Sequence, residues 1–466
     1  MLRRSNEFRD KNDALKFLND PKNNIMFVRL IFPDILGRLR EFCVPVSEIS
    51  DVINYGKSFE GGSVDGLIRM MDSDLRIKPD PKSLKIIPWT YIGSDDNITW
   101  KEALIFGEIF TAEGEHYAGD TRHILKKILQ KANETFNIDD FQIGLEPEFF
   151  ILKSPIRPEC VDKGNYYLGG KNGEIRKEIQ IYLHEMGIRT ESDYHGESCS
   201  QHVIKLKHAN AKDMADNFMI YKYVVKKVAR RFAYYATFMP KPFEDMGGSG
   251  LHVHQSLWSK NKNMIYDEKD RYKLSYLGKR YLAGILKYSK EISLITNNWL
   301  NSYKRIKGNS TAPAYAIWGR SNQSLYARIP DFAGRENAAR IELRNPDSCT
   351  NPYLCFSAIL SAGLQGVKDN LELETPFESD IEQLKDDEKE NLDKSRLPKN
   401  LKIALDMARE SNLLKYSIGL HAFKKMISAK EEELRKYEEK TGLDIDDEKQ
   451  VAKITDFEID EYLHWM

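Results

Sequence analysis

Acidic and basic side chains spaced two residues apart in apolar segments are the features of this sequence most suited to chemistry. Glu146 and Glu148 flank a single proline, and His252 and His254 follow the run Gly247-Gly-Ser-Gly250. Successive side chains of a strand point to opposite faces, so each pair is expected to share one face. Two half-buried carboxylates need a positive charge between them, and a hard divalent cation such as Mg²⁺ or Mn²⁺ supplies it. The alternative interpretation of the two histidines is a hydrogen-bonded pair in the core.

The segment Arg340-Ile-Glu-Leu-Arg344 repeats this spacing with a glutamate between two arginines. Arginine forks suit phosphate or carboxylate groups, and Glu342 is a further candidate metal ligand. An edge-strand ladder of salt bridges is the structural alternative. The three segments together predict a pocket for a metal, a polyphosphate and an anionic substrate. The sequence has no phosphate-binding G-x-x-x-x-G-K-[ST] loop and no G-x-G-x-x-G fingerprint, so metals and arginines would hold any nucleotide.

Composition predicts a soluble globular protein. The 466 residues include 41% hydrophobic and 30% charged residues, with a net charge of −1, so there is no basic field for nucleic acid or an anionic membrane. No apolar run approaches a membrane span, and the first residues lack the apolar core of a signal peptide. The five scattered cysteines, without a C-x-x-C pair, fit a cytoplasmic location and give no disulfide framework.

Residues 20–112 are rich in strand signals and include an expected hairpin over residues 25–44. Asp120 is a predicted N-cap for a helix that starts at Thr121. Strands then alternate with long helices at 175–187, 210–233 and 271–293, which indicates an α+β or α/β domain. We predict two domains, residues 1–112 and 113–466.

Seven segments, in this order, make the chain resemble the glutamine synthetase family, and they cover roughly residues 20–466. The segments are Gly144-Leu-Glu-Pro-Glu-Phe-Phe150, Thr237-Phe-Met-Pro-Lys-Pro242, Gly248-Ser-Gly-Leu-His-Val-His-Gln-Ser256, Asn301-Ser-Tyr-Lys-Arg305, Ala327-Arg-Ile-Pro330, Arg340-Ile-Glu-Leu-Arg344 and Asn351-Pro-Tyr-Leu-Cys-Phe356.

The resemblance implies an α+β protein with an N-terminal β-grasp domain and a C-terminal catalytic domain, a curved antiparallel sheet with helices. It implies a homo-oligomer, a dodecamer of two stacked hexamers whose active sites are completed by the neighbouring N-terminal domain. It also implies ATP-dependent formation of L-glutamine from L-glutamate and ammonia through γ-glutamyl phosphate, with Mg²⁺ or Mn²⁺ as cofactor.

The resemblance also assigns roles to individual residues. It implies catalytic roles for Glu60, Asp74, Arg305 and Arg328, with Asp74 lining the ammonium site of the neighbouring subunit. The implied metal ligands are Glu146, Glu148, Glu197, His252 and Glu342. The implied nucleotide contacts are His254, Arg328 and Arg340, and the implied glutamate-side contacts are Gly248, Arg305 and Arg344.

The chain departs from the family pattern around the glutamate and ammonia. Glu60 stands where the family usually has an aspartate that binds ammonium, and Thr311 replaces a flap glutamate. Gly247 replaces an asparagine that contacts the α-amino group of glutamate, and Gln323 replaces an arginine on the phosphate side.

Two further departures concern the metal ligands. Val203 replaces one metal-ligand glutamate, and Glu197, at a shorter spacing, is the candidate to replace another. We expect the cation position that lacks the Val203 carboxylate to be weak or empty. The tyrosine of the family's adenylylated loop has no counterpart near residues 375–383.

Three interpretations stay open at this point. The first is a glutamine synthetase with a modified site. The second is a ligase that joins the γ-carboxylate to a larger amine, which needs room and less negative charge. The third is a non-catalytic homologue with a binding or regulatory role.

Overall fold

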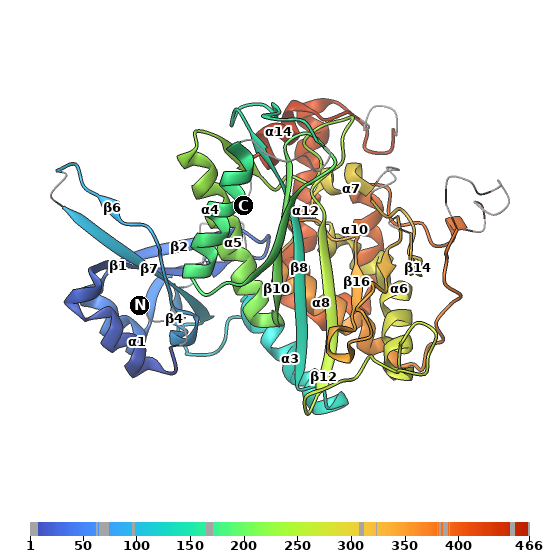
Figure 1. Cartoon of the computed structure of the whole chain (residues 1–466), viewed down its shortest axis with the longest axis horizontal. Coiled ribbons are helices and arrows are strands. Elements are labelled where there is room, and N and C mark those ends of the chain that lie inside the picture. Colours follow the sequence, from blue (N-terminus) through green and yellow to red (C-terminus); the bar gives the residue numbers. More distant parts are fainter. Residues whose placement is uncertain are drawn as a thin grey trace.

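A computed structural model of the chain describes residues 8–61, 64, 74–95, 98–164, 171–306, 312–322, 324–379, 381, 384, 390, 392–447 and 453–464. Two β-sheets organise these residues, and Figure 1 shows the smaller sheet, in blue, at one end of the molecule. The expected α+β composition is confirmed, with a β-grasp domain followed by a catalytic domain.

The smaller sheet has the order β2-β1-β7-β4-β3 and carries β5 and β6 on β7. The expected hairpin is present, since β1 (Ile25–Pro33) pairs antiparallel with β2 (Leu39–Pro45). The other elements are α1 (Lys11–Leu18), α2 (Ile49–Tyr55), β3 (Lys57–Glu60), β4 (Asp74–Pro79), β5 (Lys85–Ile86), β6 (Tyr91–Ile92) and β7 (Thr99–Phe110).

Alternation along β1 and β7 divides the burial between two cores. Leu30 and Ile105 face the core of the N-terminal domain, whereas Ile31 and Phe106 face the main core. A strand buries alternate residues on opposite faces, so this sheet has its own core on one side and the catalytic domain on the other.

The larger sheet has the order β14-β15-β16-β12-β8-β10-β9, with β11 on β8 and β13 on β12. Its described strands pair antiparallel except β14 and β15, which are parallel, so the sheet is mixed. The strands are β8 (Asp140–Leu152), β9 (Thr190–His195), β10 (Gln201–Asn210), β11 (Tyr235–Thr237), β12 (Leu251–Ser259), β13 (Lys262–Asn263), β14 (Trp318–Gly319), β15 (Ala327–Arg328) and β16 (Ile341–Leu343).

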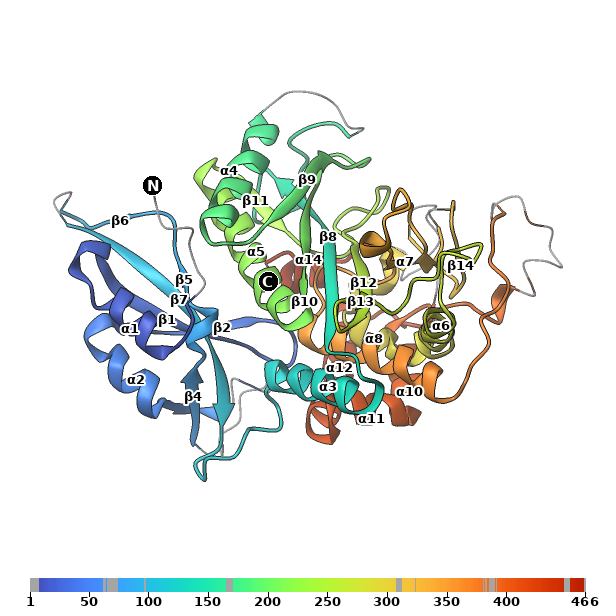
Figure 2. The same cartoon turned by 60° about the horizontal axis from the view of Figure 1, so that its bottom comes forward.

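Long helices cover this sheet, as Figure 2 shows for α3, α8, α10 and α12 beneath β8. Asp120 caps α3 as expected, with its carboxylate accepting from the backbone N–H groups of Arg122 and His123. The helices are α3 (Thr121–Phe136), α4 (Lys171–Glu185), α5 (Ala211–Arg231), α6 (Tyr276–Thr296), α7 (Leu300–Ile306), α8 (Pro352–Lys368), α10 (Leu401–Glu410), α11 (Asn412–Ile418), α12 (Leu420–Thr441) and α14 (Asp456–Tyr462). In the described part of the chain, none is both long and apolar enough for a membrane span.

Arg122, the second residue of α3, joins the N-terminal domain to helices of the catalytic domain through a buried ion-pair network. Its guanidinium contacts Asp80 at 2.6 Å and Glu108 at 3.3 Å, both from the N-terminal domain. It also contacts Asp216 of α5 at 3.0 Å, and Tyr353 of α8 donates to that carboxylate. Breaking such a buried network by removing one member typically costs about 3–5 kcal/mol, so Arg122 fixes the N-terminal sheet against the catalytic domain.

Candidate active site

Neighbouring strands of the larger sheet bring the predicted acidic and basic residues side by side. His252 on β12 lies directly across from Glu146 on β8, and His254 lies across from Glu342 on β16. Arg328 on β15 faces Glu342 from the other side. Residues directly opposite one another in antiparallel strands share a face. One face of the sheet therefore carries all five side chains.

His252 is the centre of this cluster. Its Nδ1 atom is buried without a hydrogen-bond partner and lies 3.5 Å from Oε1 of Glu342 and 3.7 Å from Oε2 of Glu146. Its Nε2 atom lies 4.0 Å from Oε1 of Glu148. An imidazole nitrogen among carboxylate oxygens is a donor set suited to a divalent cation.

The ionisation of Glu146 supports this arrangement. Burial opposes the charged form, but His252 and His254 outweigh it and hold the pKa of the Glu146 carboxyl well below its ordinary range. The carboxylate is therefore anionic, and its charge is stabilised by the neighbouring imidazoles.

His254 links Glu146 to Arg340. Arg340 Nε donates to His254 Nδ1 at 3.2 Å, and His254 Nε2 lies 2.7 Å from Oε1 of Glu146. Arginine can only donate, so Nδ1 accepts and Nε2 carries the proton that His254 donates to Glu146. Gly144 lies opposite His254, and a Cβ atom there would make an ordinary contact with the Cβ of His254 at 3.6 Å.

Glu342 is held between two arginines. It is almost fully buried, and its two oxygens accept from Arg328 Nε and Arg344 Nη1, each at 2.8 Å. Burial raises its pKa, but His254, His252 and the two arginines outweigh it and lower the pKa to about 2. Arg344 Nε has no hydrogen-bond partner, so the guanidinium keeps a buried donor for another group.

Arg305 enters the site from α7 rather than from the sheet. It is 4% exposed and donates to the carbonyl oxygens of Asn345 at 2.7 Å and Arg344 at 3.0 Å. Desolvation lowers its pKa, and Glu148 partly opposes that effect. Gly248 lets the backbone pass close to Arg305 and Pro240. A Cβ atom at this position would lie 3.0 Å from Arg305 Cγ and 2.1 Å from the backbone oxygen of Pro240.

β10 places an apolar residue, Val203, beside Glu148 on this face. Val203 lies directly across from Glu148 and is buried, so no carboxylate stands opposite at that position. Glu148 Oε2 instead accepts from the Gly250 N–H at 2.7 Å and from Gln201 at 3.2 Å. This half of the face therefore offers a cation fewer oxygen ligands than the His252 half.

Lys205 belongs to the same face and was missed by the sequence reasoning. It follows Val203 by two residues, and its Nζ lies 2.7 Å from Oε1 of Glu146. The i, i+2 rule that selected the glutamate and histidine pairs also selects Lys205 once Val203 is placed in the site.

Other predicted residues lie apart from this face. Glu60 and Asp74 are exposed and directly opposite one another on β3 and β4 of the N-terminal sheet. Glu197 is exposed on the turn between β9 and β10, and the Gly247 N–H donates to Ser198 Oγ at 2.9 Å. Thr311 and Gln323 lie outside the described residues. The roles assigned to these residues stay predictions.

A second histidine cluster lies beside the turn between β9 and β10. Asp162 accepts from the Ser200 N–H at 2.7 Å and lies 2.9 Å from Nε2 of His195. Arg176 Nη1 donates to Nδ1 of His202 at 2.9 Å, so Nε2 of His202 carries the proton and has no lone pair for a metal. The group holds the turn in place and is poorly suited to a cation.

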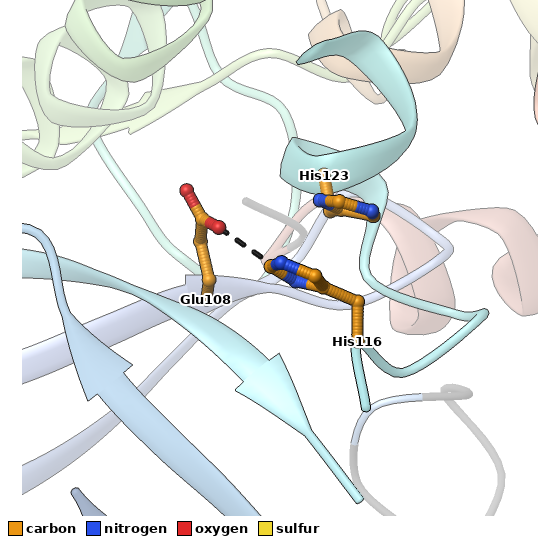
Figure 3. Close-up of side chains that lie close together, drawn as sticks. All are labelled: Glu108, His116 and His123. Carbon is orange, nitrogen blue, oxygen red and sulfur yellow. Dashed lines mark ion pairs between the residues drawn. The ribbon is translucent and has the colours of Figure 1, made fainter. Parts of the chain in front are cut away.

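A third cluster joins Glu108, His116 and His123 where β7 approaches α3 (Figure 3). The two imidazole rings stack with centroids 3.7 Å apart and planes 9° apart, so their nitrogen lone pairs run parallel rather than converging. Glu108 is already paired with Arg122 and Lys126. The cluster is therefore a contact between the domains with little capacity for a metal.

A curved sheet that carries carboxylates, imidazoles and arginines on one face, beside a small strand-rich domain, defines an enzyme that handles a cation and anionic substrates. Family models agree with this class: the glutamine synthetase β-grasp domain matches residues 24–111, and the glutamine synthetase catalytic domain matches residues 118–444. The chain belongs to the glutamine synthetase family.

Similar proteins extend over most of the chain. Glutamine synthetase of Methanosarcina mazei is 35% identical over 435 residues, which are 92% of this chain and 94% of the relative. That of Thermotoga maritima is 35% identical over 423 residues, 89% and 94% of the two chains.

Solved structures show the same fold. A GmaS/ADP complex has a TM-score of 0.81 at 26% identity and covers 92% of this chain and 97% of that one. The cryo-EM structure of Plasmodium falciparum glutamine synthetase has a TM-score of 0.82 at 24% identity, with 94% and 98% covered, and shows the fold alone.

Proposed function

We propose that this protein is a glutamate–ammonia ligase, which forms L-glutamine from L-glutamate and ammonia while ATP becomes ADP and phosphate. The observation that carries the proposal is the buried, unpartnered Nδ1 of His252 between Glu146 and Glu342, next to arginines. The relatives named glutamine synthetase favour ammonia over a larger amine, and an enzyme over a non-catalytic homologue.

Glu146, His252 and Glu342 are the residues that would hold Mg²⁺ or Mn²⁺. A bound cation neutralises the polyphosphate of ATP and the charge that develops during phosphoryl transfer. Glu148 is a further candidate ligand, although Gly250 and Gln201 already donate to it. Glu197 is exposed and would have to turn inward to join them.

In the first step, an oxygen of the glutamate γ-carboxylate attacks the γ-phosphorus of ATP, and the bond to the bridging oxygen breaks to release ADP. We assign Arg328, Arg340 and His254 to the nucleotide side. Arg305 and Arg344, with Gly248, are assigned to the glutamate side. Fixed positive charges aimed at the transferring group stabilise the transition state without reorganising.

In the second step, the nitrogen of ammonia attacks the acyl carbon of γ-glutamyl phosphate, and phosphate leaves with the electrons of the C–O bond. The nitrogen must also lose a proton, and we assign Glu60 and Asp74 to the ammonium site. Both residues face outward from the N-terminal sheet, which supports an active site completed by a neighbouring subunit.

We propose an assembly of two stacked hexamers, which membership of the glutamine synthetase family supports. We further propose a cytoplasmic location, which the five free cysteines support, and a domain boundary between residues 112 and 113.

The test is an assay of the full-length protein with ATP, glutamate and Mg²⁺ or Mn²⁺, with glutamine and ADP quantified together. Ammonium should give one glutamine per ADP, and a panel of methylamine, ethylamine and larger amines should give little amide. Glu342→Gln should abolish turnover, whereas exposed Glu336→Gln should retain it. Amide from larger amines only would establish a redirected ligase. No turnover by an intact assembly would establish a non-catalytic homologue.

A further inference from the structure

The position of Lys205 is set by the register of the sheet. Val203 pairs with Glu148 and Leu206 pairs with Leu145, so Lys205 lies directly across from Glu146. Its Nζ contacts Oε1 of that carboxylate at 2.7 Å, and the two side chains are 28% and 13% exposed. The contact is therefore part of the sheet and is largely shielded from water.

The ring of Tyr194 also lies close to the ammonium group of Lys205. The Nζ atom is 5.6 Å from the centroid of that ring, a distance at which the ring attracts a cation. Tyr194 is paired with Val203 across β9 and β10, so the backbone sets this contact as well. The ammonium group is thus held toward Glu146 by two neighbouring strands.

Val203 and Lys205 together change what the face can bind. Val203 places an apolar side chain opposite Glu148, and Lys205 places a positive charge opposite Glu146. A cation near these glutamates would therefore lack a ligand at Val203 and would be repelled by the positive charge of Lys205. The group around His252 Nδ1, by contrast, keeps carboxylate oxygens on two sides.

We propose that the ammonium group of Lys205 is a built-in cation of the phosphoryl-transfer site. It supplies, through Oε1 of Glu146, positive charge that a divalent ion on the Glu148–Val203 side would otherwise bring. It leaves Oε2 of Glu146, together with His252 and Glu342, for one strong divalent site. This inference rests on the proposed function, because it assigns Lys205 to the polyphosphate of the same ATP. An ammonium is a point charge with three donors, which suits phosphate oxygen.

The test counts Mn²⁺ bound to the nucleotide-free full-length protein, with free Mn²⁺ measured by electron paramagnetic resonance. The unaltered protein should bind one ion tightly per chain. Lys205→Gln should bind Mn²⁺ roughly tenfold more tightly or gain a second ion, because a nearby like charge is removed. Lys207→Gln, an exposed position two residues along β10, makes the same change in net charge and should match the unaltered protein.

Two more variants separate charge from folding. Lys205→Arg keeps the positive charge and should retain a single tight ion. Val203→Glu should add a second ion weakly, and more tightly when it is combined with Lys205→Gln. ADP binding, by fluorescence or calorimetry at low Mn²⁺, should weaken in Lys205→Gln and not in Lys207→Gln.

Two tight ions in the unaltered protein, or equal Mn²⁺ binding by Lys205→Gln and Lys207→Gln, would overturn the inference. Neither readout requires glutamine formation. A protein that binds metal as expected but forms no amide would contradict the proposed function alone.

Discussion

Replacing Glu342 with glutamine tests whether the charge of this carboxylate organises the site. The substitution keeps the size and shape of the side chain and removes the charge that Arg328 and Arg344 share. The pKa of Glu342 falls from 4.5 to about 2 as its neighbours outweigh burial. At about 1.4 kcal/mol per pH unit, this difference corresponds to about 3 kcal/mol of stabilisation of the charged form.

The direction of the pKa shift of Glu342 determines how the free energy of unfolding depends on pH. A carboxyl group whose pKa is lower in the folded chain contributes its full stabilisation above the unfolded value of about 4.5 and loses it as the pH falls toward 2. Glu342→Gln should therefore lower the free energy of unfolding by about 3 kcal/mol at pH 7. The difference from the unaltered protein should shrink below pH 4.5.

The assay is urea unfolding of the metal-free protein in EDTA at pH 7, with the free energy taken from the midpoint and the slope. Exposed Glu336→Gln serves as the matched control. If both variants unfold at the same urea concentration, the electrostatic account of Glu342 is wrong. A second measurement adds Mn²⁺, which should raise the midpoint of Glu336→Gln and leave that of Glu342→Gln nearly unchanged.

Two further predictions concern the backbone and the domain contact. Gly248→Ala should strongly reduce glutamine formation, because its Cβ atom would lie 2.1 Å from the oxygen of Pro240. Gly173→Ala should leave activity unchanged, because among the described residues its Cβ atom would meet only Arg176 Nη2, at an ordinary contact distance of 3.9 Å. Normal activity of Gly248→Ala would show that the loop yields easily. Burial lowers the pKa of His123 to about 4, so the folded protein should lose stability as the pH falls from 6.5 toward 4. Urea unfolding at pH 7 and pH 5 should show a smaller loss of stability for His123→Gln than for the unaltered protein. The exposed control His184→Gln should lose as much stability as the unaltered protein. Equal pH dependence of the two variants would show that His123 is not the cause of the loss.

Local patterns predicted which side chains share a face where these side chains lie on strands. The i, i+2 spacing of Glu146 and Glu148, and of His252 and His254, placed each pair on one face, and the sheet register then brings the pairs together. Asp120 was predictable for the same reason, because an N-cap depends on a few neighbouring residues. Such features need no knowledge of distant contacts.

Features set by distant contacts were less accessible. The strand β5 extends over only Lys85–Ile86, because its partner β7 continues in pairings with other strands. The pairing of His116 with His123 depends on how the N-terminal domain meets α3. Lys205 was overlooked although the i, i+2 rule places it on the same face as Val203. Its contact with Glu146 depends on the register of β10 with β8, which one sequence does not reveal.

The register also gives one departure from the family pattern, Val203, a physical counterpart in Lys205. With valine rather than a carboxylate at position 203, the face has one ligand fewer for a cation near Glu148. If that cation is not bound, Glu146 and Glu148 lack its positive charge, and unpaired carboxylates are costly to bury. Lys205 restores one positive charge on the same strand, two residues away and in direct contact with Glu146. Val203 and Lys205 then act together, because the lysine provides next to Glu146 part of the positive charge that a bound ion would provide. A site that had only decayed would have no reason to keep Glu146, Glu342 and the unpartnered nitrogen of His252 so closely arranged.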